Sequence, residues 1–167
     1  MTNLITRWKS LGPYLQSLLR IVAAFIFTSI GTMKLFAFPV AMFPNGGTAK
    51  LFSELGLAGT LETFGGALLL LGLFTRPVAF ILAGEMAVAY FQAHFPHGFW
   101  PALNGGQPAV LYCFIWLYFS ATGAGAWSID AIGEWYRVRS HRKWLLRCGP
   151  NNIHGLTVVG DGCIFNH

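Results

Sequence analysis

Charged residues are scarce in this 167-residue chain, at 10% of the sequence, whereas an ordinary soluble domain has about 25%. So few charges cannot cover a soluble surface, and the 54% hydrophobic share and mean hydropathy of +0.54 point the same way. A disordered chain is also excluded, because disordered segments are polar and poor in aromatic residues, which here make up 16%. Much of the surface is therefore expected to face lipid.

Cysteine is equally sparse, with three residues scattered along the chain, too few for a disulfide framework. The net charge of +5 would suggest nucleic-acid binding only if the basic residues covered a soluble face. They instead flank the apolar segments, which is the distribution that membrane topology produces. We therefore expect the partner to be a lipid bilayer and not nucleic acid.

Four apolar segments are each close to the 20 or so residues that a helix needs to cross a bilayer core. They cover residues 18–38, 55–74, 77–95 and 108–126. No charged residue occurs between Met86 and Ile129, so the last segment has no polar outer face. The predicted fold is all-α, a membrane-spanning four-helix bundle over residues 18–130.

The flanking regions are predicted to be interfacial, with an N-terminal segment over residues 1–17 and a basic amphipathic segment over residues 131–147. A tail follows over residues 148–167. Its cysteines and histidines do not follow a zinc-binding spacing, so a short hairpin or a loose tail is the preferred interpretation, with residues 155–165 as the candidate for a small strand pair.

Lysine and arginine counts predict the orientation in the membrane. With both termini in the cytoplasm, nine of the eleven basic residues lie on the cytoplasmic side, whereas Lys34 and Lys50 lie outside. We expect a multi-pass protein of the cytoplasmic membrane whose first span is retained.

Two ionisable residues within the first two segments are predicted to form an ion pair. Lys34 follows Arg20 by 14 residues, a rise of ~21 Å along a helix. Glu62 precedes Arg76 by 14 residues on the next, antiparallel helix, so it reaches the same level. The pair is interpreted either as a structural clamp or as part of a polar outer pocket.

Glu85 lies nine residues after Arg76, or ~13 Å along the third helix, near the middle of the bilayer. No basic residue is expected at that level. Glu85 is therefore either a neutral, hydrogen-bonded core carboxyl or a group that contacts a proton path or a ligand.

Polar residues also follow the third segment, where His94 and His97 are joined by Asn104 and Gln107. They suggest a pocket at the outer mouth for a quinone head group or a small polar substrate, although a simple interfacial loop fits as well. Two histidines without a third ligand do not make a metal site, and none is predicted. The candidate pocket residues are Lys34, Glu62, Glu85, His94, Asn104 and Gln107.

Five ordered motifs resemble the DoxX family. They are Gly31-x-x-Lys34-Leu35-Phe36, Glu62-x-x-Gly65-Gly66 with Leu71-Gly72-Leu73-Phe74-Thr75-Arg76, Met86-Ala87-x-Ala89, Asn104-Gly105-Gly106, and Gly123-x-Gly125-x-Trp127-Ser128-x-Asp130. The resemblance implies a four-helix protein of the bacterial or archaeal cytoplasmic membrane. Some relatives are subunits of a thiosulfate:quinone oxidoreductase or belong to membrane-associated redox assemblies.

The same resemblance implies polar family positions at Lys34, Glu62, Arg76, Asn104 and Asp130. This chain departs from it at Gln107, where members commonly have Glu, and at Ala126, where many have Arg. Structural roles are assigned to Arg20, Arg76 and Asp130.

No nucleophile triad, phosphate-binding loop or dinucleotide fingerprint occurs, so the sequence supports no catalytic mechanism of its own. The first hypothesis is a non-catalytic subunit of a redox-linked membrane assembly, with quinone as the candidate ligand and redox-enzyme subunits as partners. Alternatives are a small proton-coupled transporter unit, which would have to be a homo-oligomer, and a purely structural membrane scaffold.

Overall fold

The computed structural model describes residues 2–43, 46–136, 156–159 and 162–165. It separates into two compact units, Met1–Ala131 and Ile132–His167. Of the basic segment predicted over residues 131–147, residues 131–136 are helical and the rest lies outside the described residues. The same holds for most of the 148–167 tail.

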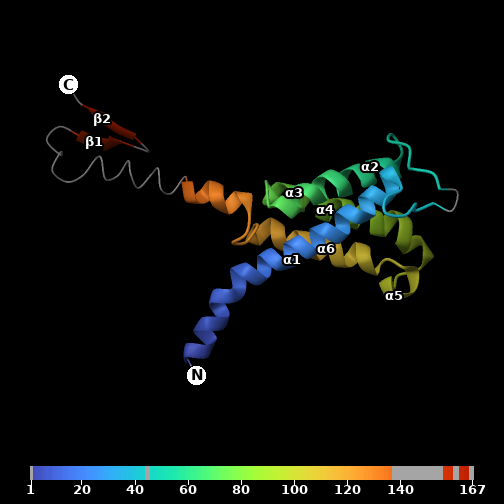
Figure 1. Ribbon diagram of the computed structural model, residues 1–167, viewed down its shortest axis with the longest axis horizontal. Helices are drawn as coiled ribbons and strands as arrows, with labels where there is room; N and C mark the ends of the chain where they lie inside the picture. Colours follow the sequence, from blue (N-terminus) through green and yellow to red (C-terminus); the bar gives the residue numbers. More distant parts are fainter. Residues whose placement is uncertain (1, 44–45, 137–155, 160–161, 166–167) are drawn as a thin grey trace. The chain divides into compact units, whose positions relative to one another are not determined.

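The first unit begins with one long helix, α1 (Thr2–Phe36), which bends in its N-terminal half (Figure 1). The sequence predicts a separate interfacial segment up to residue 17, but α1 runs through Pro13 and on into the first apolar segment. A proline removes one main-chain donor and clashes with the preceding turn, and a bend relieves that clash without ending the helix.

The second apolar segment is continuous but changes its winding. It consists of α2 (Glu54–Thr60), the π-helical turn η1 (Leu61–Gly65) and α3 (Gly66–Leu71). Ser53 begins it as an N-cap, because its hydroxyl accepts a hydrogen bond from the Gly56 N–H at 3.1 Å. Gly72 ends it in the left-handed conformation, which glycine adopts without strain.

The third and fourth segments follow the same pattern, with short elements between them. They comprise α4 (Thr75–Ala89), the π-helical turn η2 (Tyr90–His94), the 3-10 turn η3 (Phe95–His97), α5 (Pro101–Asn104) and α6 (Gln107–Thr122). Helices α1, α3, α4 and α6 lie side by side, and α5 lies at one end of them (Figure 1).

Within the described residues, three helical stretches are long and apolar enough to cross a membrane: Ser10–Phe36, Glu54–Leu71 and Thr75–His97. They correspond to the first three predicted spans. Helix α6 has 16 residues, which at 1.5 Å per residue gives ~24 Å and falls short of a bilayer core of roughly 30 Å.

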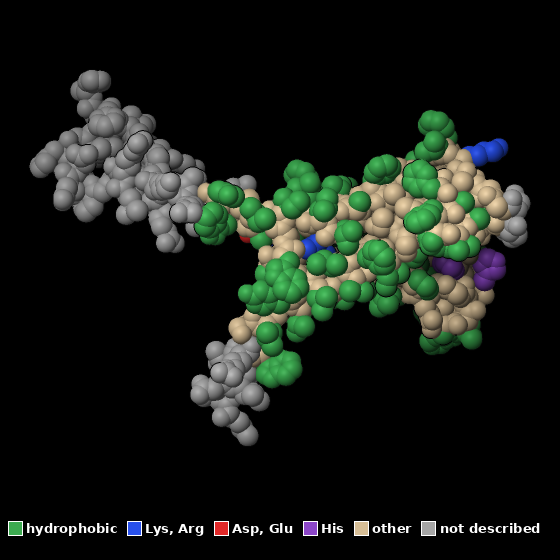
Figure 2. Space-filling view, viewed as in Figure 1, with side chains coloured by type: hydrophobic (Ala, Val, Ile, Leu, Met, Phe, Trp, Pro, Cys, Tyr) green, Lys and Arg blue, Asp and Glu red, His purple; other side chains and the backbone are tan. Residues whose placement is uncertain are grey.

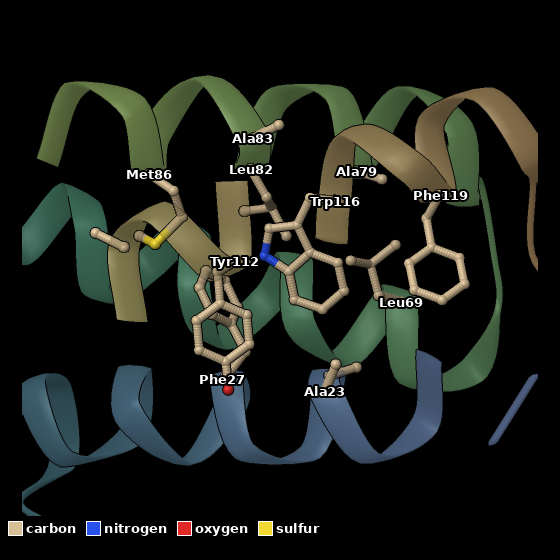
Figure 3. Packing of buried hydrophobic residues seen from close by; sticks show 12 residues of the cluster. Ala23, Phe27, Leu69, Ala79, Leu82, Ala83, Met86, Tyr112, Trp116 and Phe119 are labelled. Atoms are coloured by element: carbon tan, nitrogen blue, oxygen red, sulfur yellow. The ribbon is translucent and has the colours of Figure 1, made fainter. Parts of the chain in front are cut away.

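One apolar core joins these helices (Figure 3). Trp116 of α6 is fully buried at its centre, with its ring 5.2 Å from that of Phe27 and 5.7 Å from that of Tyr112. Leu69 of α3 and Leu82 of α4 pack into the same cluster. Hydrophobic side chains also cover the outer face of the helices in view, as lipid contact requires (Figure 2).

Small residues bring the helices close together. Ala79 and Ala83 of α4 are buried in the core. On α1, Gly31 lies against the second segment, where an added Cβ would be 2.5 Å from Thr63 Oγ1 and 2.6 Å from the Thr63 nitrogen. Contact with main chain leaves little room for adjustment, so α1 and η1 touch at this glycine.

We therefore expect Gly31→Ala to destabilise the protein by about 1–3 kcal/mol, the usual cost of overpacking. Gly84→Ala is the matched control, because nothing lies within 4 Å of an added Cβ at that exposed helical position. It should stabilise α4 by about 0.5–1 kcal/mol, since alanine is the better helix former. Unfolding in a mixed-detergent titration measures both, and equal effects would contradict the close approach at Gly31.

The second unit contains an antiparallel hairpin of β1 (Leu156–Val159) and β2 (Gly162–Phe165), in which Leu156 is paired with Phe165. The strand pair predicted in this part of the tail is therefore present.

Candidate functional site

The predicted ion pair between α1 and η1 is confirmed. Lys34 Nζ lies 2.6 Å from Glu62 Oε1, and the two side chains are 12% and 3% exposed. Gly59 permits this approach, because an added Cβ there would be 3.1 Å from the Lys34 Cβ. The pair is thus a buried, charge-assisted hydrogen bond between two membrane-spanning stretches.

The main chain around Glu62 is unusual. Glu62 lies in η1, one of two π-helical turns among the described residues, and such turns occur frequently at functional sites. Its second carboxyl oxygen, Oε2, is buried and has no hydrogen-bond partner in the described part of the chain, and the same is true of the neighbouring Thr63 Oγ1. The ion pair therefore leaves half of the Glu62 carboxyl group available.

Glu85 of α4 belongs to the same polar cluster. Both of its carboxyl oxygens are buried without a partner among the described residues, and α4 packs against η1, the turn that carries Glu62. The sequence places no cation at the level of Glu85. That expectation used helical rise, which gives a distance along one helix. It gives no information on how α4 packs against the second segment.

This cluster of Lys34, Glu62 and Glu85 combines one ammonium group with two carboxyl groups. Three carboxyl oxygens remain unpaired, namely Glu62 Oε2 and both oxygens of Glu85. Native proteins rarely bury polar groups without partners, because each one costs free energy. The arrangement therefore offers hydrogen-bonding capacity, of both donor and acceptor type, to a polar group that enters between the helices.

The other pocket candidates lie in the connection between α4 and α6. His94 Nδ1 lies 3.1 Å from the Asn104 carbonyl oxygen, to which it donates as the Nδ1–H tautomer. The Asn104 side chain donates to the Gly98 carbonyl at 2.7 Å and accepts from the Gly106 N–H at 2.8 Å. Gln107 begins α6 and is exposed. His94 and Asn104 thus form hydrogen bonds within the connection, whereas Lys34 and Glu62 bond to each other in the ion pair.

Arg20 has the most extensive contacts of any charged residue that the structure describes. It is fully buried, and its guanidinium group donates to main-chain carbonyls from two distant parts of the chain. Nε donates to Ala124 at 2.9 Å, Nη1 to Leu69 and to Leu70 at 2.8 Å, and Nη2 to Trp127. We call this group of contacts the Arg20 clamp.

Two neighbours of Arg20 on α1 complete the clamp. Ser17 Oγ accepts from the Trp127 N–H at 3.0 Å, and the Gln16 amide donates to the Gly123 carbonyl at 2.7 Å. Gly125 has a φ of +81°, and an added Cβ would be 2.5 Å from Ser17 Oγ. Sequence reasoning missed Gln16 and Ser17. The signal was their position, one turn before a buried arginine and opposite a Gly-x-Gly motif.

Asp130 holds the same end of the helices together in a different way. Its carboxylate accepts from the main-chain N–H groups of Phe74 and Thr75, both at 2.9 Å, so it caps the start of α4. Its own N–H donates to Gly72 at 2.9 Å. Arg76 is exposed and lies beside Gly123. Asp130 therefore ties the start of α4 to the residues after α6, whereas the structural role predicted for Arg76 stays a prediction.

Comparisons with known proteins show which family contains this arrangement of residues. Residues 15–95, which contain Arg20 and the whole Lys34–Glu62–Glu85 cluster, match the DoxX family model. The chain is also 46% identical over 122 residues to an uncharacterised protein of Haemophilus influenzae, a match that covers 71% of this chain and 90% of the relative. The chain belongs to the DoxX family. No solved structure matches this DoxX protein.

Family membership and the three apolar helical stretches together identify a small membrane protein.

Proposed function

We propose that this DoxX protein is a non-catalytic subunit of a redox-linked assembly in the cytoplasmic membrane and that the Lys34–Glu62–Glu85 cluster binds a quinone. In this proposal α6, extended by its flanking apolar residues, forms the fourth span of a four-helix bundle, and both termini lie in the cytoplasm. The positive-inside distribution of lysine and arginine supports that orientation.

The observation that carries the proposal is the set of unpaired carboxyl oxygens beside a buried ammonium group. A quinone carbonyl accepts hydrogen bonds, and Lys34 has three N–H donors, of which the ion pair with Glu62 uses one. A quinol hydroxyl donates, and the free oxygens of Glu62 and Glu85 accept. The cluster therefore matches both oxidation states, while the surrounding apolar helices suit the ring and tail.

The test uses the full-length protein purified in mild detergent. Bound quinone is extracted and quantified, and a short-chain ubiquinol analogue, kept reduced, is titrated into stripped protein. Glu62→Gln should weaken binding of the quinol by roughly tenfold or more, because the quinol hydroxyl loses a charged acceptor, and a hydrogen bond to a charged group contributes about 1.5–3 kcal/mol. Glu54→Gln is the matched control, since Glu54 is an exposed carboxylate in the first turn of α2.

Binding by the unaltered protein that Glu62→Gln removes and Glu54→Gln leaves intact supports the proposal. Absence of bound quinone together with absence of binding of the added analogue overturns it, as does equal binding by all three proteins. The assembly is tested separately by identifying oxidoreductase subunits that co-purify with the detergent-solubilised chain.

A second candidate function, a proton-coupled transporter unit, is favoured by Glu85 alone. Its carboxyl group is buried on a membrane-spanning stretch and has no partner among the described residues, as expected of a group that exchanges a proton during transport. Glu85→Gln should then abolish proton flux in proteoliposomes that the unaltered protein supports. Equal flux through both proteins, or flux through neither, eliminates this candidate.

A further inference from the structure

The connection between α4 and α6 turns large apolar side chains outward. Leu103 is 86% exposed and Trp100 is 65% exposed, and the rings of Phe95 and Phe99 are exposed beside them. The rings form a continuous row, with centroids 6.3 Å apart for Phe95 and Phe99 and 5.5 Å apart for Phe99 and Trp100. In water each such side chain would forgo about 1.5–3 kcal/mol of burial free energy.

Polar side chains of the same connection are paired with its main chain. The Tyr90 hydroxyl donates to the Phe99 carbonyl at 2.6 Å, and Asn104 bonds to Gly98 on one side and to Gly106 on the other. His94 donates to the carbonyl of Asn104 itself. Three side chains thus satisfy main-chain groups that helices would otherwise pair. The remaining main-chain groups need the hydrated headgroup layer, because the hydrocarbon core does not tolerate lipid-exposed irregular backbone.

The lack of charged residues and the continuity with an apolar helix also indicate that the connection between α4 and α6 lies in lipid. The stretch from Met86 to Ile129 contains no Lys, Arg, Asp or Glu. The connection also continues directly from the apolar stretch Thr75–His97, which is long and apolar enough to cross a membrane. Aromatic side chains gather where a membrane-spanning helix reaches the lipid–water boundary.

We propose that residues 95–106 form an interfacial element embedded in the lipid headgroup layer and the adjoining acyl chains, with the row from Phe95 to Leu103 directed into the bilayer. Tyr90, His94 and Asn104 act as positioning residues that keep its main chain hydrogen-bonded there. This inference is independent of the quinone proposal, because it involves none of Lys34, Glu62 or Glu85.

The test is a nitroxide label at Leu103→Cys in the full chain, with the three native cysteines replaced by serine, reconstituted into phosphatidylcholine–phosphatidylglycerol vesicles. Phe80→Cys is the lipid reference, because Phe80 is exposed on α4 within the apolar stretch. Lys50→Cys is the water reference, because Lys50 is an exposed charged residue between α1 and α2. All three substitutions are at exposed positions, so the fold should persist.

The Leu103 label should collide with oxygen, which concentrates in lipid, about as often as the Phe80 label does, and should be protected from a water-soluble nickel complex. Adding Asn104→Ala should increase the nickel accessibility of the Leu103 label several-fold while leaving that of the Phe80 label unchanged. A Leu103 label as accessible to nickel as the Lys50 label overturns the proposal. Protection from both reagents also overturns it, because protein would then cover the row.

Brominated lipids provide a second readout that avoids a label. The difference in fluorescence between the unaltered protein and Trp100→Phe isolates the Trp100 emission. That emission should be quenched more by bromine near the headgroups than by bromine near the chain ends. Lack of quenching by either lipid contradicts the inference.

Discussion

Arg20→Met is expected to lower the free energy of unfolding by about 3–5 kcal/mol, because it removes four hydrogen bonds from a charged donor and regains only the cost of burying that charge. Arg20 is fully buried and makes four hydrogen bonds to carbonyls. Methionine fills similar volume but cannot donate to these carbonyls, and each buried group left unsatisfied costs about 1–3 kcal/mol. Leu69 still accepts from the Gly72 N–H at 3.1 Å. Unfolding in a titration from mild detergent into dodecyl sulfate measures the loss.

Two further variants show whether geometry or charge is responsible. Arg20→Lys keeps the charge but has no planar fork with which to reach two carbonyl groups at once, so it should recover less than half of the loss. Arg76→Met is the matched control, because Arg76 is exposed, and its effect should stay within about 0.5 kcal/mol. Similar effects of Arg20→Met and Arg76→Met would contradict the clamp.

Lys34→Met has the second large expected effect, a destabilisation of about 3–5 kcal/mol. It leaves the Glu62 carboxylate, which is 3% exposed, without its counter-ion among membrane-spanning stretches. The double variant Lys34→Met/Glu62→Leu should be more stable than Lys34→Met alone, because it removes both charges and replaces them with apolar groups. The same detergent titration applied to all members of the cycle gives the coupling free energy.

The variants of Lys34 and Glu62 also distinguish effects on stability from effects on quinone binding. Glu62→Gln keeps an oxygen that can accept from Lys34, so its effect on stability should be smaller than that of Lys34→Met even where quinone binding is lost. If the effects of Lys34→Met and Glu62→Leu simply add, the two side chains do not interact energetically, and the ion pair contributes nothing to the fold.

The sequence predicts correctly those features that depend on residues close together along the chain. Hydropathy located the first three apolar stretches, and helical rise placed Lys34 and Glu62 at the same level, because both arguments depend only on residues counted along one helix. The interfacial segment predicted over residues 1–17 stays a prediction, but residue 17 is not a helix boundary, because α1 runs through Pro13 with a bend. A proline in a sequence shows that one main-chain donor is missing. It does not show whether the helix ends there or continues with a bend.

Long-range main-chain contacts could not be read from the sequence. The acceptors of Arg20 are carbonyl groups, which every residue has, so Leu69 and Trp127 carry no side-chain signal for their role. The proximity of Glu85 to the ion pair depends on lateral packing between helices, which the sequence does not encode in any simple spacing. The motif Gly123-x-Gly125 is evident in the sequence. The contact between Gly125 and Ser17, which explains the second glycine, is evident only in the structure.

The Arg20 clamp imposes an order on biosynthesis. Ala124 and Trp127, which accept from Arg20, are synthesised 104 and 107 residues after it. The first helix must therefore enter the bilayer while its arginine is still hydrated or bound to lipid phosphate, and it receives its permanent acceptors only after the last helix has left the ribosome. Nascent chains truncated before residue 124 should consequently be more sensitive to membrane proteases than the finished protein.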